Sequence, residues 1–357
     1  MASNVDLTIS RILSTGAEYK ASDLHMTVGN PPILRVDGKL LPLADEQIIT
    51  PDFMSDFTDF VLSAEQKKIL NENKEIVTAF TMPNKIRLKI NIFFQKGVLA
   101  ASLRFIPATI KNIKELGLPP IVENFTQLTK GLLIITGPFS SGRTATVAAL
   151  INAINKTRAC HIMTIEKPIE NIFVNNKSII EQREVGRDTK SFEQALSTAS
   201  REDVDVIMVS EMQERTVFQS VLNAAESSRL VISSMNTDTV LKTIEKIINS
   251  FPPEEEEKVR IQLSETLEGI VCQRLLPRVG GGRIVVAEVM IPTPPIRTVI
   301  KEGAFYQLQN IIQTAREEGT ISLDRAMAEL VRTGEILMDD ALAHATDRAN
   351  LKIMTRR

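Results

Sequence analysis

The sequence predicts an α/β protein in which a small α+β domain precedes a domain built around a parallel sheet and a helical C-terminal section. Three observations predict this order. Short alternating segments fill residues 1–107, apolar runs separated by helical stretches fill residues 131–290, and helical apolar stripes fill residues 291–357. At 357 residues the chain is too long for one ordinary core, so we expect more than one domain.

The N-terminal domain, residues 1–107, is predicted to combine a helix with antiparallel strands. Apolar residues between positions 5 and 16 recur at helical spacing and favour an amphipathic helix. Asp37-Gly38 separates two short apolar runs, which is a strong signal for a two-residue hairpin turn. Alternating segments predict three further antiparallel strands at 75–82, 85–94 and 98–106.

Residues 108–130 are predicted to be a linker, because Gly117, Pro119 and Pro120 interrupt the regular patterns there. In residues 131–290, apolar runs alternate with helical stretches, as is typical of a parallel sheet built from βαβ units. The runs lie at 132–136, 161–165, 204–209 and 230–234. Ligands bind such sheets beyond the carboxyl ends of the strands. The residues expected there are Gly137, Glu166, Glu211 and Asn236.

Residues 137–144, Gly-Pro-Phe-Ser-Ser-Gly-Arg-Thr, have the spacing of a phosphate-binding loop. In such a loop backbone N–H groups surround the phosphates, a lysine reaches them, and a hydroxyl binds Mg²⁺. Gly137, Gly142 and Thr144 fit, but Arg143 stands where lysine is expected. Arginine keeps the positive charge, although its planar fork is wider than an ammonium. The alternative is a plain glycine-proline turn between a strand and a helix.

The C-terminal section, residues 291–357, is predicted to be helical. An apolar stripe from Leu323 to Val331 ends before Gly334, and a second helix is expected from about Asp339 to Thr346. Earlier in this section, residues 295–302 place their apolar side chains on one helical face.

Composition excludes several classes of protein. With 42 basic and 44 acidic residues the net charge is -2, and with two tyrosines and no tryptophan there is no aromatic platform, so we expect no nucleic-acid partner. Cys160 and Cys272 are too far apart to indicate a metal cluster or a disulfide framework. No apolar stretch approaches the ~18 residues of a membrane-spanning helix, and no signal peptide is recognisable. We therefore expect a cytoplasmic protein without direct membrane insertion.

Several short phrases, together with the loop and the strands, resemble the type IV pilus retraction ATPases, the PilT and PilU group of the secretion ATPases. The phrases are Ser22–His25, Pro31–Gly38, Thr164–Glu170, Gln182–Val185, Arg201–Asp203, Val209–Met212 and Gly280–Arg283. Residues 87–97 and 349–352 look closer to PilU than to PilT. The resemblance implies a PAS-like N-terminal domain, a RecA-like P-loop ATPase domain and a ring of six subunits with nucleotide held between domains.

The same resemblance implies a set of ATP-binding and catalytic residues. The phosphate-binding loop would contribute Gly137, Pro138, Ser140, Ser141, Gly142, Arg143 and Thr144, with Thr144 also binding Mg²⁺. Glu211 matches the general base that follows the Walker B strand, and its alternative is a solvated carboxylate at a strand end. Glu166 keeps the first acid of an acidic box in which Lys167 replaces aspartate, and its alternative is a salt-bridge partner.

Further positions depart from the family or are shared with it. Asn236 replaces the histidine of the family's histidine box, and Arg229 also stands where histidine is usual. Asparagine donates a hydrogen bond but carries no positive charge. Arg87 and Arg104 match N-terminal arginines that contact phosphates, while an ordinary charged strand face is the alternative. Residues 295–302 resemble the A-I-R-N-L-I-R-E segment of PilT, which would make them a retraction element, and a short packed helix is the alternative there.

These residues predict a retraction motor subunit, active in twitching motility, that binds ATP and Mg²⁺ and turns ATP over slowly. We expect four substitutions to change the charge and hydrogen bonding of the same nucleotide cleft: Arg143, Lys167, Asn236 and Arg229. The expected partners are further copies in a homo-hexamer, or an active PilT-type paralogue, and an inner-membrane pilus platform protein. The expected place is the cytoplasm, peripheral to the inner membrane at the pilus base. A fully active ATPase and a non-catalytic assembly or regulatory subunit remain alternatives.

Overall fold

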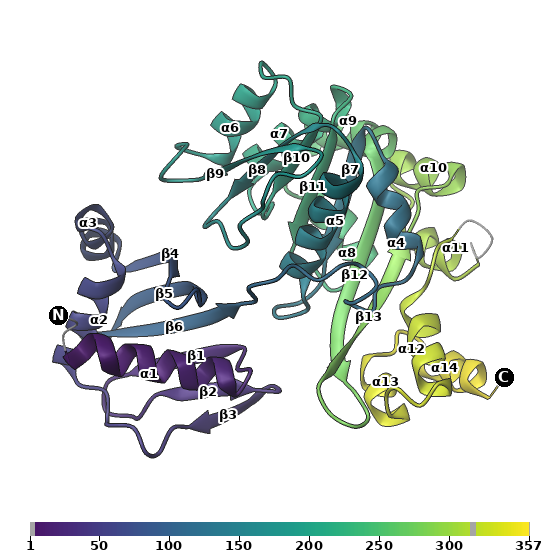
Figure 1. Ribbon diagram of the computed structural model, residues 1–357. Helices are drawn as coiled ribbons and strands as arrows, with labels where there is room; N and C mark the ends of the chain where they lie inside the picture. The colour runs from purple at the N-terminus through teal and green to yellow at the C-terminus, as the bar shows by residue number, and fades with distance from the viewer. Residues whose placement is uncertain (1–3, 315–318, 357) are drawn as a thin grey trace. The chain divides into compact units, whose positions relative to one another are not determined.

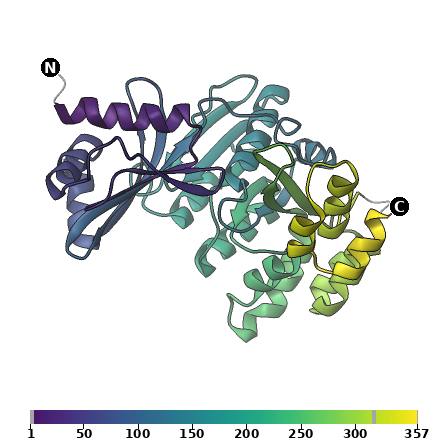
Figure 2. The ribbon, with the colours of Figure 1, turned by 90° about the horizontal axis from the view of Figure 1, so that it is seen from below.

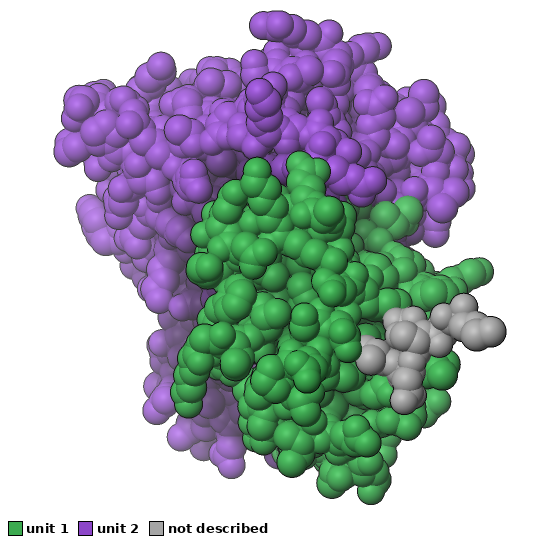
Figure 3. Space-filling view, turned by 90° about the vertical axis from the view of Figure 1, so that its left-hand side faces the viewer, with its two compact units in different colours: residues 1–109, 167–172 green, residues 110–166, 173–357 purple. Residues whose placement is uncertain are grey.

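The computed structural model describes residues 4–314 and 319–356 and separates into two compact units. Figure 1 shows the elements of each unit, and Figure 3 colours the first green and the second purple. The first unit comprises residues 1–109 and 167–172, and the second comprises residues 110–166 and 173–357. Residues 167–172, which follow Glu166 directly, therefore pack with the N-terminal part of the chain.

The first unit is built on a six-stranded antiparallel sheet in the order β3-β2-β1-β6-β5-β4. The strands are β1 (Asp23–Thr27), β2 (Ile33–Val36), β3 (Lys39–Pro42), β4 (Glu75–Thr81), β5 (Arg87–Gln95) and β6 (Val98–Ile106). Its helices are α1 (Asn4–Glu18), α2 (Pro51–Val61) and α3 (Ala64–Asn73). Buried residues from the helices, such as Ile12 and Phe57, share one core with Leu24, Ile90 and Leu103 of the sheet.

The predicted helix and antiparallel strands of this unit are confirmed. Asp37 and Gly38 have φ values of 46° and 84°, so both central residues of the β2–β3 turn adopt the left-handed conformation that a tight hairpin requires. Arg87 and Arg104 lie on β5 and β6, whose residues alternate between the core and the opposite face. Leu88, Ile90 and Leu103 are fully buried, so the two arginines belong to the face away from the core.

The second unit is built on a seven-stranded sheet in the order β13-β12-β7-β11-β10-β8-β9. The strands are β7 (Gly131–Thr136), β8 (His161–Glu166), β9 (Ile179–Glu184), β10 (Val206–Val209), β11 (Leu230–Met235), β12 (Leu267–Pro277) and β13 (Arg283–Met290). All neighbours pair in parallel except β12 and β13, which form an antiparallel pair. The predicted parallel sheet is therefore confirmed, and β9, β12 and β13 extend it.

Helices cover both faces of this sheet. They are α4 (Ile121–Asn124), α5 (Arg143–Thr157), α6 (Phe192–Ala199), α7 (Arg215–Glu226), α8 (Val240–Ile248), α9 (Pro253–Thr266), α10 (Pro294–Glu302) and α11 (Leu308–Thr314), with short 3₁₀ turns at Phe125–Gln127 and Phe305–Gln307. Residues from α4 and α5 share one core with one sheet face, and residues from α6 to α10 share a second core with the other face. Ile113, Leu118, Val122 and Phe125 belong to the first of these two cores.

The C-terminal helices form a small cluster of their own, drawn in yellow in Figures 1 and 2. They are α12 (Leu323–Arg332), α13 (Met338–His344) and α14 (Arg348–Thr355). Met327, Ala341 and Leu351 pack against Leu276 of β12 and Val286 of β13. The two helices predicted here are confirmed, and α14 is a third. Within residues 4–314 and 319–356, no helix is both long and apolar enough to cross a bilayer.

Candidate nucleotide site

The predicted site residues of the second unit gather at the carboxyl edge of its parallel strands. β7 ends directly before Gly137, β8 ends at Glu166, and β11 ends directly before Asn236. Glu211 follows the end of β10 by two residues. Because β7, β11, β10 and β8 are successive neighbours in the sheet, the four positions lie along one edge.

The loop after β7 has the backbone of a tight phosphate cradle. Gly137, Ser140 and Gly142 have φ values of 151°, 61° and 90°, which L side chains adopt only with strain. A Cβ atom on Gly137 would stand 2.2 Å from the carbonyl oxygen of Gln273. The loop therefore needs glycine at position 137 for space as well as for conformation.

Helix α5 begins at Arg143, directly after Gly142, and no side chain caps its N-terminus. The first N–H groups of a helix lack intrahelical acceptors, and its N-terminus favours negative charge. Ser141, which is 2% exposed, has a hydroxyl with no hydrogen-bond partner in the described part of the chain. An anionic phosphate group would fit this arrangement.

The remaining loop residues are placed as follows. The Pro138 carbonyl accepts a 3.3 Å bond from the Ser141 N–H, which closes the turn, and Ser140 is exposed. Thr144 is exposed in the first turn of α5, where its hydroxyl would be available to Mg²⁺. Across residues 4–314 and 319–356, no group of three or more His, Cys, Asp or Glu side chains could hold a metal ion by itself. A Mg²⁺ bound here would take oxygen ligands such as the Thr144 hydroxyl, waters and phosphate oxygens.

Arg143 forms an ion pair with Glu211, with 3.8 Å between Arg143 Nη1 and Glu211 Oε1. Their side chains are 14% and 35% exposed, so the pair is partly shielded from solvent. The backbone on both sides of Glu211 is fixed. Ser210 N–H donates to the Ile165 carbonyl at 3.0 Å, and Met212 N–H donates to the Ser234 carbonyl at 2.9 Å. The cation that replaces the loop lysine thus contacts the carboxylate predicted to be the base.

Glu166 is buried at the end of β8, with 3% of its surface exposed. One of its carboxylate oxygens, Oε1, accepts hydrogen bonds from Thr164 Oγ1 at 2.7 Å and Gln182 Nε2 at 3.0 Å. These donors fix the orientation of the carboxylate at the edge of the sheet. A buried carboxylate is stable there only because it is hydrogen-bonded.

Asn236 is held beside the phosphate loop by Thr136, the last residue of β7. The Thr136 hydroxyl contacts the carbonyls of Met235 at 3.1 Å and Thr237 at 3.0 Å. It also contacts the Thr237 hydroxyl. These contacts tie the turn that carries Asn236 to the start of the loop.

Arg229 does not belong to this edge. It precedes β11, whereas Asn236 follows that strand, and six residues of strand span about 20 Å. Its guanidinium donates to the carbonyls of Val204 and Ser200, each at 3.2 Å, and to the Ser227 hydroxyl at 2.8 Å. The expectation that Arg229 alters the same cleft as Arg143 and Asn236 is wrong, because it lies at the amino edge of the sheet.

In the first unit, both predicted phosphate-binding arginines have protein partners. Arg104 Nε lies 2.9 Å from Asp23 Oδ1. Arg87 donates to the carbonyls of Ile169 at 2.5 Å and Glu170 at 2.6 Å. Lys89 pairs with the Glu170 carboxylate at 2.8 Å. Arg87 therefore holds the backbone of residues 167–172 within this unit, and its contact with phosphate stays a prediction.

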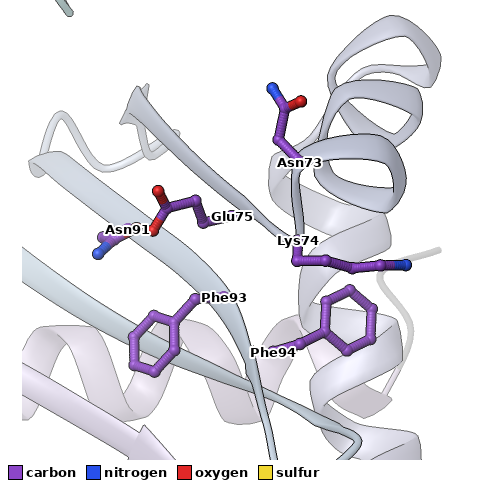
Figure 4. A pocket seen from close by; sticks show the side chains of 6 residues that line it. All are labelled: Asn73, Lys74, Glu75, Asn91, Phe93 and Phe94. Carbon is purple, nitrogen blue, oxygen red and sulfur yellow. The ribbon is translucent and has the colours of Figure 1, made fainter.

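A pocket of about 410 Å³ also lies in the first unit, beside the start of β4. Figure 4 shows its lining residues, Asn73, Lys74, Glu75, Asn91, Phe93 and Phe94. Lys74 Nζ lies 5.3 Å from the centre of the Phe94 ring, while Glu75 pairs with Phe93 across β4 and β5. In Figure 4 the side chains of Lys74 and Glu75 point to different sides, so the two charged groups do not converge on one ligand.

The profile of the family described as "Type II/IV secretion system protein" matches residues 3–343. The chain belongs to this family. Within this family the chain is 37% identical over 342 residues to the type IV pilus retraction ATPase PilT of Pseudomonas aeruginosa, which covers 94% of this chain and 97% of the relative. It is 32% identical over 351 residues to the type IV pilus ATPase PilU of the same species, covering 98% and 92%. The predicted family resemblance is confirmed.

A solved structure of the pilus retraction motor PilT with bound ADP is similar over 96% of this chain and 98% of its own, with 39% identity and a TM-score of 0.84. The ATPase DotB of Legionella pneumophila has a TM-score of 0.80 at 22% identity, which shows a shared fold. The predicted α/β architecture of this secretion family is thus confirmed. The identity to PilT, 37%, is higher than the 32% identity to PilU, while the likeness to PilU extends over 98% of the chain.

Two features of the site were not predicted from sequence. One is the Arg143–Glu211 ion pair, which joins the first residue of α5 to the loop after β10. The other is Gln273, which contacts the phosphate loop from β12. A polar side chain after the apolar run 270–272 was the available signal for Gln273.

Proposed function

We propose that this protein is a type IV pilus retraction motor subunit, active in twitching motility, that binds Mg-ATP at the carboxyl edge of β7, β11, β10 and β8 and hydrolyses it slowly. Its likeness to a retraction motor with bound ADP supports nucleotide binding. The uncapped N-terminus of helix α5 and the glycine-lined loop before it support the position of the phosphates at this edge. The observation that carries slow turnover is the Arg143–Glu211 ion pair.

Within this proposal, Glu211 orients the attacking water beside the γ-phosphate. A guanidinium 3.8 Å away competes with that water for the carboxylate. When phosphate enters the loop, Arg143 is drawn toward it, but its planar fork does not occupy the position of a compact ammonium. Either arrangement aims positive charge poorly at the transition state, which slows the chemical step more than it weakens binding.

The other residues of the edge have complementary roles in the proposal. The loop amides from Gly137 to Gly142 and the N-terminus of α5 hold the phosphates. The Thr144 hydroxyl would hold Mg²⁺, which when bound neutralises phosphate charge. Glu166, fixed by Thr164 and Gln182, supplies the second carboxylate. Asn236 donates a hydrogen bond to phosphate but adds no positive charge.

The proposed architecture follows the family. Residues 1–107 form a PAS-like domain, residues 108–130 a linker, residues 131–290 a RecA-like nucleotide-binding domain and residues 291–357 a helical section. Six subunits form a ring, either of this chain alone or mixed with an active PilT-type paralogue. The ring acts in the cytoplasm, against a platform protein of the inner membrane at the pilus base, and Arg87 and Arg104 serve the nucleotide phosphates.

A fully active retraction ATPase is the second candidate. The intact Gly137, Gly142, Thr144, Glu166 and Glu211 favour it, as does the 35% exposure of Glu211, which leaves room for a water. A non-catalytic assembly subunit is the third, and it would bind no ATP.

Steady-state phosphate release by the purified full chain tests the proposal. We expect saturable binding of a fluorescent ATP analogue with slow turnover, and a turnover at least about tenfold faster after Arg143→Lys with Asn236→His, equivalent to ~1.4 kcal/mol of barrier. The Glu211→Gln variant is the control for the chemical step. Fast wild-type hydrolysis that Glu211→Gln abolishes would establish the second candidate, and absence of saturable binding would establish the third.

A further inference from the structure

Gln273 contacts the phosphate-binding loop at both of its essential glycines, although it lies outside the loop motif. It follows Cys272, which pairs with Thr136 at the end of β7, so β12 places Gln273 beside Gly137. Gln273 is 1% exposed, and its side-chain Nε2 donates to the Ser141 carbonyl at 2.7 Å. Its own carbonyl lies 2.2 Å from where a Cβ of Gly137 would be, and its Nε2 lies 3.1 Å from where a Cβ of Gly142 would be.

The hydrogen bond to Ser141 has a defined effect on the next amide. In a planar trans peptide the C=O and the N–H point in opposite directions. A donor that fixes the Ser141 carbonyl toward Gln273 therefore directs the Gly142 N–H away from Gln273. The side-chain amide itself has one usable orientation, because its oxygen would repel the Ser141 carbonyl oxygen.

We propose that Gln273 is a positioning residue that sets the Ser141–Gly142 peptide so that the loop amides receive the β-phosphate of a nucleoside diphosphate or triphosphate. This inference rests on the proposed nucleotide site and adds a residue to it. Gln273 acts through the loop backbone and does not itself touch the nucleotide.

A structural role and a positioning role predict different results at this residue. Gln273 Oε1 is buried and has no hydrogen-bond partner among the described residues. Replacing glutamine by methionine removes the hydrogen bond to Ser141, but it also removes this unsatisfied acceptor, and the two effects on stability oppose each other. The Ser141–Gly142 peptide is then no longer held, so phosphate affinity falls while the fold is largely retained.

The experiment compares the full-length wild type, Gln273→Met and a matched control, Gln262→Met. Gln262 is a second buried glutamine of the same unit, and its amide bonds Asn223 and Glu226 between α9 and α7 instead of the loop. Calorimetry measures the dissociation constants of Mg-ADP and of AMP, and melting without nucleotide measures stability. We expect Gln273→Met to weaken Mg-ADP binding about tenfold with AMP binding unchanged, and Gln262→Met to leave both constants unchanged.

A second variant, Gln273→Glu, tests the same hydrogen bond if Gln273→Met does not fold. A carboxylate cannot donate to the Ser141 carbonyl, whereas a protonated carboxyl can. We therefore expect the Mg-ADP affinity of Gln273→Glu, relative to wild type, to recover as pH falls.

Three results would overturn the inference. The first is a dissociation constant of Mg-ADP for Gln273→Met that lies within twofold of wild type. The second is a loss of AMP affinity in Gln273→Met as large as its loss of Mg-ADP affinity. The third is a Mg-ADP affinity of Gln273→Glu, relative to wild type, that does not change with pH. Absence of saturable Mg-ADP binding by the wild type would instead defeat the proposed nucleotide site itself.

Discussion

At position 143 arginine stands where the phosphate-loop motif has lysine, and its guanidinium pairs with the carboxylate of Glu211. Arg143 is the first residue of α5 and Glu211 follows β10, yet the sheet brings Arg143 Nη1 and Glu211 Oε1 to 3.8 Å. The sequence predicted each residue separately, from the loop spacing and from the end of an apolar run. It did not predict their pairing, because side-chain reach across neighbouring strands depends on register.

The position of residue 229 in the sheet could not be predicted from its residue type alone. Asn236 and Arg229 were both expected to stand where the family has histidine, but Asn236 follows β11 and Arg229 precedes it. Sequence similarity alone does not show at which edge of the sheet a residue lies. Only the strand bounds separate the two positions.

Placing histidine at these two positions should therefore give different results. We expect Asn236→His to raise ATP turnover, because imidazolium adds positive charge beside the loop. Arg229→His should leave turnover unchanged and lower thermal stability by about 1–2 kcal/mol, since it loses donors to the Val204 and Ser200 carbonyls. Phosphate-release assays and thermal melts measure both. Equal gains in turnover would show that Arg229 acts at the site after all.

Glu288 on β13 gives the stability of the protein a pH dependence. Burial raises the pKa of its carboxyl from 4.5 to about 7, although the Val240 N–H and Arg274 favour the charged form. The unfolded chain releases this proton near pH 4.5, whereas the folded chain keeps it until about pH 7. Stability from this group is therefore fully present below pH 4.5 and is lost as the pH rises to about 7.

The Glu288→Gln variant tests this dependence. Glutamine cannot ionise, so we expect it to exceed wild type by about 2 kcal/mol in unfolding free energy at pH 8, a figure reduced for the partial exposure of the residue. At pH 4 the two should be nearly equal. Urea unfolding at both pH values measures the difference, and a constant offset between them would contradict the assignment.

At the scale of elements, the strands that carry the site were predictable and the elements around them were not. The four parallel strands are short apolar runs, each followed by glycine or a polar residue, so their carboxyl ends could be located. Strands β12 and β13 were missed because β12 depends on pairing with β7, and β13 on pairing with β12, which local patterns do not encode. Helices α2 and α3 were missed although capping signals were present, with Thr50 bonding the Phe53 N–H and Ser63 the Gln66 N–H.

The glycines of the phosphate loop differ from other glycines with positive φ in the space around their Cα atoms. Gly137 has no space for a Cβ, whereas Gly186, with φ 91°, has no atom within 4 Å of one. We expect Gly137→Ala to abolish Mg-ADP binding. Gly186→Ala should cost about 1 kcal/mol of backbone strain and leave binding intact. Calorimetric titration checks both, and retained binding by Gly137→Ala would show that the loop is not a close-fitting cradle.

At the scale of the whole molecule, similarity over nearly all of the chain identifies the family, while the two compact units are described separately. Short phrases spread from Ser22 to Lys352 made the family predictable from sequence. The placement of residues 167–172 with the first unit was not predictable. It depends on Arg87 and Lys89, which contact the backbone and carboxylate of Glu170.

The proposed assembly makes a prediction about particle composition. Mixed with an active PilT-type paralogue, this chain should enter six-subunit particles that contain both proteins, because the two share fold and length. Native mass spectrometry of the mixture measures composition directly. Particles that contain only one kind of subunit would contradict co-assembly and leave a homo-hexamer as the proposal.

ATP is proposed to bind at the carboxyl edge of the second unit's sheet and to persist there. The most direct measurement loads the purified chain with labelled Mg-ATP, removes free nucleotide and follows the bound label. We predict that most of the bound label is still ATP after about a minute, well beyond the sub-second turnover of a typical enzyme. Conversion of the bound label to ADP within a second would show fast turnover, and no retained label would show that ATP is not held there; either result would disprove a slow ATP-binding motor subunit.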